Sequence, residues 1–168
     1  SYQHDAPLDM RMNPKDKQTA YDLVNGLPID QLRQIIFDYG EERWTHRIVE
    51  FINEERQKSP IKTTHQLVSI IKAAIPKKAR LEGPHPAART FQALRIAVND
   101  ELGALRETLH KAISYLKPKG RLCVISFHSL EDRIVKHAFR QASGVCSCPP
   151  GLPICHCSKQ KLIEIITS

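Results

Sequence analysis

The apolar residues between positions 16 and 76 recur at spacings of three and four, as they do on one face of an amphipathic helix. The first clear stripe predicts a helix over 30–40, with its first residue as the N-cap and its last, a glycine, in the C′ position. A second helix is predicted over 41–57, and a third begins at the capping box formed by Thr63 and Gln66. These helices predict a compact helical subdomain, and their inward residues are Leu32, Ile35, Ile36, Tyr39, Trp44, Ile48, Ile52, Leu67, Val68, Ile71 and Ile75.

The second half of the chain mixes helical and strand-like patterns. The most regular apolar stripe predicts one long helix within 87–116, with a bend possible at Gly103. The nearly continuous apolar run at 121–127 predicts a strand buried on both faces, and a last helix is expected to be capped by Ser129. Helix, short loop, buried strand and helix in this order are typical of an α/β domain. The stripe of the long helix consists of Phe91, Leu94, Val98, Leu102, Leu105, Leu109, Ala112 and Leu116.

The composition limits the class of protein to which the chain can belong, but it does not identify the fold. The chain has 168 residues, of which 41% are hydrophobic and 26% are charged, and no apolar run approaches the roughly 20 residues that a membrane span requires. We therefore expect a soluble, cytoplasmic protein of one domain with at most a small inserted subdomain. The apolar run at 161–168 would be a strand with no partner after it, so we also expect a fragment of a longer protein.

Positive charge is concentrated in one segment of the chain. The formal net charge is +7, and residues 58–95 hold eight basic residues against one acidic residue, Glu82. Within this segment Lys77, Lys78 and Arg80 lie in a linker that is punctuated by glycine and proline. A basic segment on a neutral remainder is typical of proteins that bind a polyanion, although a solvated basic loop has the same composition.

A polar cluster follows the predicted strand. Ser126, His128, Ser129 and Asp132 would lie at the carboxyl end of that strand, where open α/β sheets bind ligands. In a structural alternative, Ser129 caps the next helix, Asp132 favours the positive end of that helix and His128 bonds the loop. A hydrolase with Ser126 or Ser129 as nucleophile is a third interpretation, but the cluster lacks the G-x-S-x-G turn of such enzymes.

A second candidate surface lies on the predicted long helix. Gln92, Arg95 and Asn99 are spaced by three and four, so they share a helix face that points away from the apolar stripe. Such a row offers donors to phosphates and base edges, and it could equally be a salt-bridged surface. From the residues alone, we predict an α/β domain with a helical insertion and a polyanionic partner.

Four cysteines form two pairs in the sequence near the C-terminal end. Cys146 with Cys148, and Cys155 with Cys157, are C-x-C pairs joined by a loop rich in proline and glycine. In a reducing cytoplasm this set favours a structural zinc site over disulfides. The C-x-C spacing is tighter than the usual C-x-x-C, so ligation by His156 and free thiols are open alternatives.

Three phrases resemble one known family in their order and spacing. They are "APLDMRM" at 6–12, "HPAARTFQALRIAVNDEL" at 85–102 and "GRLCVISFHSLEDRIVK" at 120–136. The family is that of the bacterial S-adenosylmethionine-dependent 16S ribosomal RNA cytosine-N4 methyltransferases (RsmH/MraW). Intermediate phrases agree as well, so the resemblance covers nearly the whole chain.

The resemblance implies an α/β fold, namely a partial Rossmann-like core of a methyltransferase that uses S-adenosylmethionine, with an inserted all-helical subdomain. Residues 1–15 and 77–168 would belong to the core, and residues 16–76 would form the insertion. The residues that bind the methyl donor would precede Ser1, so no cofactor-binding residue is expected in this chain. We expect the chain alone to be inactive.

The implied reaction transfers a methyl group to the exocyclic N4 of a cytosine in 16S ribosomal RNA, either as free RNA or in the small ribosomal subunit. Asp9, His128 and Asp132 are the acceptors available to the amino group, and His128 could also take the departing proton. In the structural alternative, Asp9 and Asp132 pair with Arg11 and Arg133. A noncatalytic RNA-binding or ribosome-associated module is the competing hypothesis. The predicted RNA contacts are Lys77, Lys78, Arg80, Arg89, Arg95, Asn99 and Phe127.

Overall fold

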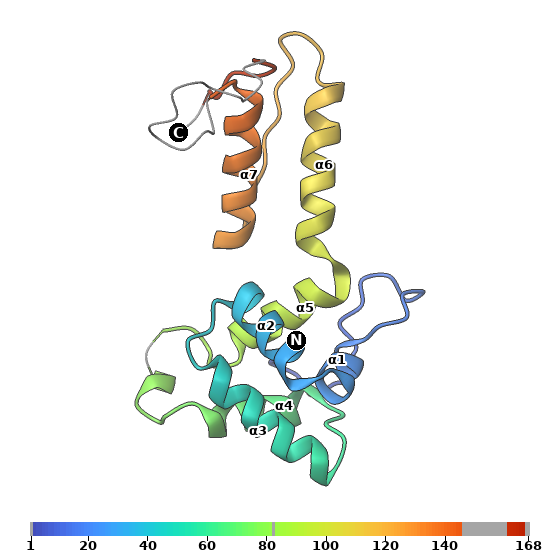
Figure 1. The fold of residues 1–168 in the computed structure, drawn as a ribbon, viewed down its shortest axis with the longest axis vertical. Helices are drawn as coiled ribbons and strands as arrows, with labels where there is room; N and C mark the ends of the chain where they lie inside the picture. Colours follow the sequence, from blue (N-terminus) through green and yellow to red (C-terminus); the bar gives the residue numbers. More distant parts are fainter. Residues whose placement is uncertain (1, 82, 146–160, 167–168) are drawn as a thin grey trace. The chain divides into compact units, whose positions relative to one another are not determined.

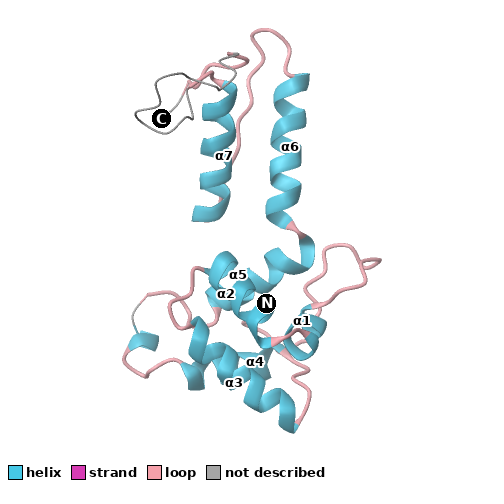
Figure 2. Ribbon diagram, viewed as in Figure 1, coloured by secondary structure: helices cyan, strands magenta, loops and turns pink. Residues whose placement is uncertain are grey.

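The computed structural model describes residues 2–81, 83–145 and 161–166. The chain divides into two compact units, Ser1–Glu101 and Leu102–Ser168. The described residues are helices joined by loops, with no strand among them (Figures 1 and 2). The α/β architecture implied by the sequence is therefore not visible in the described part of the chain.

The first unit is a helical bundle with its own hydrophobic core. In Figure 1, α2 packs against α5, and α3 packs against both α2 and α4. Buried aliphatic side chains such as Leu32, Ile48 and Leu94 are fully enclosed between these helices. The helices of this unit are α1 (Ala20–Gly26), α2 (Ile29–Gly40), α3 (Thr45–Lys58), α4 (Thr64–Ala74), the short 3-10 helix η1 (Ala79–Leu81) and α5 (Ala88–Asn99).

The capping box of α4 forms as its sequence predicts. The Thr63 hydroxyl accepts from the Gln66 backbone N–H at 3.3 Å, and the Gln66 side chain accepts from the Thr63 N–H at 3.1 Å. A second box, which we did not predict, starts α1, where Thr19 and Asp22 bond each other in the same way. Both boxes satisfy amide groups that a helix N-terminus would otherwise leave without partners.

Both boundaries of α2 differ from their predictions, and α3 begins at Thr45 rather than at residue 41. Asp30 lies in the first turn of α2 rather than at its N-cap, which is Pro28. Gly40 is the last helical residue, and Glu41 takes the left-handed conformation with φ 47°. A Cβ at position 40 would lie 2.9 Å from the Arg89 carbonyl oxygen. Gly40 is therefore required for the close approach of α2 to α5 rather than for its backbone angles.

The phrase at residues 6–12 is anchored to the loop before α4. The Leu8 N–H donates to the Lys62 carbonyl at 3.1 Å, and Pro7 forms an isolated antiparallel bridge with Thr63. The Leu8 side chain is buried in the core of the unit. This anchoring fixes the position at which the chain leaves the core of the unit, just before Asp9.

The predicted long helix is two helices. A single residue, Asp100, separates α5 from α6 (Glu101–Tyr115) by taking the left-handed conformation with φ 46°. Aspartate tolerates this conformation better than most residues because its short side chain can bond locally. The prediction of one continuous helix was therefore wrong, and the break lies at Asp100 rather than at Gly103.

In the second unit, residues 121–127 are extended but form no strand. Their side chains alternate: Leu122, Val124 and Ser126 are half-buried, whereas Ile125 is 78% exposed and Phe127 is 89% exposed. The predicted burial on both faces is therefore wrong for this structure. The physical reason is that a strand needs a hydrogen-bonding neighbour, and the described residues of this unit supply none.

The predicted strand at 161–168 is also absent from its described part, residues 161–166. The Leu162 and Ile163 N–H groups donate to the carbonyl of Ala142, which is the last residue of α7 (Ser129–Ala142). Among the described residues of the second unit, only Leu102, Leu109 and Ala142 are buried. This unit has far less core of its own than the first.

Candidate functional site

Asp9 and Arg11 form a bidentate ion pair in the loop after the buried Leu8. Arg11 Nε lies 2.6 Å from Asp9 Oδ1, and Nη2 lies 2.8 Å from Oδ2. The other guanidinium nitrogen donates to the carbonyls of Pro14 and Asp16. The sequence leaves open whether Asp9 acts on the substrate or pairs with Arg11. In this structure Asp9 pairs with Arg11.

The ion pair changes the acidity of Asp9. Hydrogen bonds from the Arg11 side chain and backbone, with the guanidinium charge, lower the pKa of Asp9 to about 2. Since these contacts stabilise the charged form, Asp9 is an ionised hydrogen-bond acceptor near neutral pH and a poor proton acceptor.

Asn99 joins two of the phrases that carry the family resemblance. Its Nδ2 donates to the Met10 carbonyl at 2.9 Å, and its Oδ1 accepts from the Met12 N–H at 2.7 Å. The same amide also donates to the Arg95 carbonyl on its own helix. The amide predicted to contact RNA is thus fully engaged within the protein.

The other polar residues of α5 also make contacts within the first unit. Gln92 donates to the Tyr39 carbonyl at 3.1 Å, and Arg89 donates to the Glu41 carbonyl at 3.0 Å. Arg95 holds both carboxylate oxygens of Glu101, at 2.7 and 2.9 Å. Gln92, Arg95 and Asn99, the row predicted to bind RNA, therefore form a hydrogen-bonded and ion-paired surface in this structure.

The basic run before α5 presents charge to solvent. Lys77 and Lys78 are exposed, whereas Arg80 lies in η1 and donates from Nε to the Ile75 carbonyl at 2.8 Å. The Ile75 carbonyl is at the C-cap of α4, so Arg80 also closes that helix. Of the predicted RNA contacts in the first unit, Lys77, Lys78, Arg89 and Arg95 are exposed, and the two arginines also make the contacts within the protein described above.

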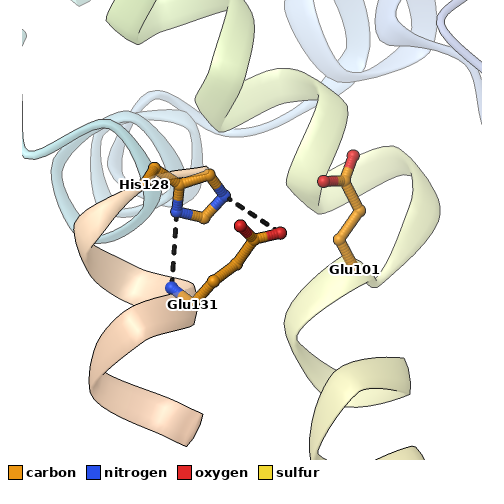
Figure 3. A group of neighbouring side chains, drawn as sticks. All are labelled: Glu101, His128 and Glu131. Atoms are coloured by element: carbon orange, nitrogen blue, oxygen red, sulfur yellow. Dashed lines mark hydrogen bonds and ion pairs between the residues drawn. The ribbon is translucent and has the colours of Figure 1, made fainter. Parts of the chain in front are cut away.

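His128 is the N-cap of α7, a position that we predicted for Ser129. Its Nδ1 accepts from the Glu131 backbone N–H at 3.4 Å, and its Nε2 lies 3.6 Å from a Glu131 carboxylate oxygen (Figure 3). Ser129 is the first helical residue instead. A ring that accepts at Nδ1 carries its neutral-state proton on Nε2, so neither nitrogen is arranged as a base while the cap is intact.

Glu131 is a residue that sequence reasoning missed. Its carboxylate accepts from the Phe127 N–H at 2.8 Å while its own N–H bonds His128. The two residues therefore close the first turn of α7 reciprocally, much as a capping box does. The signal was the spacing of three between His128 and Glu131, but histidine is not among the residues that usually cap helices.

The remaining predicted groups of the second unit lie on or before α7. Asp132 pairs with Lys136 at 2.9 Å, one turn further along the helix, rather than with Arg133. Phe127 stands almost fully in solvent. The zinc ligands predicted at Cys146, Cys148, Cys155 and Cys157 lie outside the described residues, so structural zinc stays a prediction.

Comparison with known proteins covers the whole chain. The sequence profile of the MraW methylase family matches residues 1–168. A protein of Clostridioides difficile named "Ribosomal RNA small subunit methyltransferase H" is 56% identical over 167 residues, and one of Symbiobacterium thermophilum with the same name is 58% identical over 167 residues. Each match covers 99% of this chain but only 54% and 52% of the respective relative. The chain thus spans about half the length of the curated relatives that it matches.

Among the described residues, none of the helices combines the length and the apolar character that a membrane crossing needs.

Proposed function

Since the chain belongs to the MraW methylase family, we propose that it is the downstream part of a methyltransferase that uses S-adenosylmethionine to modify 16S ribosomal RNA. The observation that carries this proposal is the family match over residues 1–168. The relatives' shared name supports ribosomal RNA of the small subunit as the substrate. We further propose that the methyl group is transferred to the exocyclic N4 of a cytosine. The reaction is proposed to take place in the cytoplasm.

We propose that residues 121–127 become a strand of a Rossmann-like core when the rest of the enzyme is present, with residues 1–15 and 77–168 as the core and 16–76 as its insertion. The alternating exposure along this segment supports the proposal, because a strand has the same period of two. The exposed side chains of Ile125 and Phe127 also support it, since central strands of such cores are covered on both faces.

The methyl donor is proposed to bind outside this chain. In the first unit, a cavity of about 470 Å³ is lined by Arg43 and Arg89, and Glu42 is the one acidic side chain among the described residues that line it. Two guanidinium groups against one carboxylate do not fit the positive sulfonium of S-adenosylmethionine. We therefore assign this chain the RNA side of the reaction.

A role in catalysis for Asp9, His128 and Asp132 stays a proposal. Their contacts support a different role for each residue. The N4 amino group is a weak nucleophile because its lone pair is delocalised into the ring, so acceptors for its hydrogens would help. Asp132, whose ion pair with Lys136 is partly exposed, is proposed as such an acceptor. His128 is proposed to position Asp132 by holding the first turn of α7, and Asp9 to hold the backbone around Met10 through Arg11.

The RNA contacts are proposed to begin with electrostatic attraction. Lys77 and Lys78 are exposed and lie in the segment that carries the whole net charge of the chain. Arg80, Arg89, Arg95 and Asn99 would have to exchange contacts within the protein for contacts with RNA. The two lysines are therefore proposed as the main phosphate contacts of this run, and their effect should weaken with salt.

The test is methyl transfer by this chain joined to the portions of the Clostridioides difficile relative that lie outside the match. The substrates are radiolabelled S-adenosylmethionine and either naked 16S ribosomal RNA or small subunits that lack the modification. We expect label in the RNA, and mass spectrometry of the nucleosides should identify N4-methylated cytidine. The chain alone, used as the control, should transfer none.

The same experiment separates the alternatives. Label on another atom would remove the N4 assignment but keep the methyltransferase. A joined protein that folds and binds the donor yet transfers no methyl group to either substrate would contradict the proposal. If that protein still bound RNA, the noncatalytic RNA-binding module would be the better explanation.

A further inference from the structure

The cavity of about 470 Å³ in the first unit combines aromatic and cationic side chains. Its walls include Arg43 and Trp44 before α3, His85 in the loop that precedes α5, and Arg89 on α5. Its volume lies within the range of pockets that bind small ligands. These side chains come from two stretches that lie far apart in the sequence, so the fold assembles the cavity.

Two contacts hold the Trp44 end of the cavity in place. The Glu42 carboxylate accepts from the Trp44 N–H at 2.9 Å, which fixes the turn that precedes α3. The Arg43 guanidinium lies over the Trp44 ring, 5.1 Å from its centroid. Glu42 carries one negative charge against the two positive charges of Arg43 and Arg89, so among the described lining residues positive charge is in excess.

His85 contributes a neutral ring rather than a third charge. Its Nδ1 accepts from the Ala87 N–H at 3.2 Å, and its ring stacks on Tyr2 with centroids 4.7 Å apart. Burial, with a smaller contribution from the charge of Lys72, lowers the pKa of His85 below its ordinary value. The neutral ring therefore carries its proton on Nε2, as a hydrogen-bond donor.

We propose that this cavity binds one nucleotide of a single-stranded RNA, in which the base takes the place of the Arg43 guanidinium on the Trp44 ring and Arg43 and Arg89 hold the phosphate. An indole face accepts any base, and planar guanidinium groups match phosphate oxygens in pairs. His85 adds a donor for the ribose or the base. This inference rests on the proposed function for the identity of the polymer, and it assigns RNA binding to residues other than the candidate catalytic ones.

Trp44 supplies its own reporter, because it is the only tryptophan in the chain. The intact chain is titrated with a short cytidine-rich ribo-oligonucleotide, with cytidine 5′-monophosphate, with cytidine and with inorganic phosphate, while tryptophan fluorescence is followed. We expect saturable quenching by the oligonucleotide and the monophosphate, weaker quenching by cytidine and none by phosphate. No methyl donor is needed, so a failed methyl transfer assay leaves this result intact.

A matched pair of variants tests the position of the site. Arg43→Gln should weaken oligonucleotide binding about tenfold. Arg47→Gln removes the same charge four residues along α3, where Arg47 lies over Phe51 rather than in the cavity, and should change binding by less than about twofold. Trp44→Ala, followed by the anisotropy of a labelled oligonucleotide, should also lose about tenfold, and Trp44→Phe should restore most of the loss.

Three outcomes would overturn the inference. One is oligonucleotide binding that leaves Trp44 fluorescence unchanged. Another is equal weakening by Arg43→Gln and Arg47→Gln, which would indicate general surface charge. The third is quenching by inorganic phosphate as strong as that by the monophosphate, which would indicate an anion site without base recognition.

Discussion

The side-chain amide of Asn99 holds the backbone of Met10 and Met12 against α5. Its Nδ2 donates to the Met10 carbonyl and its Oδ1 accepts from the Met12 N–H, across 89 and 87 residues of sequence. Met10 has a φ of 64°, a conformation that a side chain with a Cβ adopts at some cost. The bonds from Asn99 help to hold it there.

We therefore expect Asn99→Ala to destabilise the chain by about 1–3 kcal/mol, since two long-range hydrogen bonds are lost. Asn99→Asp should also destabilise it, because a carboxylate would face the Met10 and Arg95 carbonyls. Urea denaturation measures both. Asn13→Ala, which removes only bonds to nearby residues, serves as the control and should cost less than about 0.5 kcal/mol. An Asn99→Ala variant of unchanged stability but weakened RNA binding would return Asn99 to its predicted role as an RNA contact.

Gly40 provides a test of how closely α2 approaches α5. Gly40→Ala would place a methyl group 2.9 Å from the Arg89 carbonyl oxygen, and backbone cannot move aside cheaply. We expect a loss of about 1–3 kcal/mol in the free energy of unfolding. Gly26→Ala, at the end of α1, meets no atom within 4 Å and should be neutral or stabilising by up to about 1 kcal/mol. Equal effects of the two substitutions would show that helix propensity, not packing, decides.

Local signals in the sequence predicted the first unit better than the second. The capping box of Thr63 and the apolar stripe of α4 depend on residues within one helix, so the sequence predicted both correctly. The break at Asp100 depends on one backbone angle that interrupts no apolar spacing, and it was missed. The segment 121–127 has the composition of a buried strand, but its state depends on neighbours that the described residues do not provide.

The candidate site was harder to predict for a related reason. The sequence identified Asp9, Asn99 and His128 as polar residues in special positions, and each makes a specific contact. It could not say whether their partners would be RNA or the protein itself, because a donor row suits both. Only the fold reveals that Met10 and Met12 lie within reach of Asn99.

The pKa of Asp9 predicts how acid affects stability. Its folded-state pKa of about 2 lies below the ordinary value of 3.8, so the ionised form is favoured by folding. The stabilisation is complete above about pH 4 and is lost as pH falls through about 2. Wild type should therefore be more stable than Asp9→Asn at pH 7, and the difference in their denaturation midpoints should shrink between pH 4 and pH 2. A difference that stays constant over this range would mean that the ion pair with Arg11 does not form in solution.

The cap at the start of α7 allows a test of what His128 does. His128→Ala removes the acceptor for the Glu131 N–H and should weaken the first turn by about 1 kcal/mol, seen as lower helicity by circular dichroism. His128→Asn keeps an acceptor at this position, since asparagine is among the best capping residues, and should restore the helicity.

Methyl transfer by the joined protein then separates positioning from direct chemistry at His128. If His128 acts by holding the first turn of α7, transfer should follow helicity, with His128→Asn close to wild type and His128→Ala much slower. Asp132→Asn, which leaves the cap intact, should slow transfer without lowering helicity, because it weakens the proposed acceptor. A well-folded His128→Asn protein as inactive as His128→Ala would instead mean that the imidazole itself contacts the reacting base. In that case the cap seen here would have to open during the reaction, since Nδ1 cannot accept a proton while it accepts the Glu131 N–H.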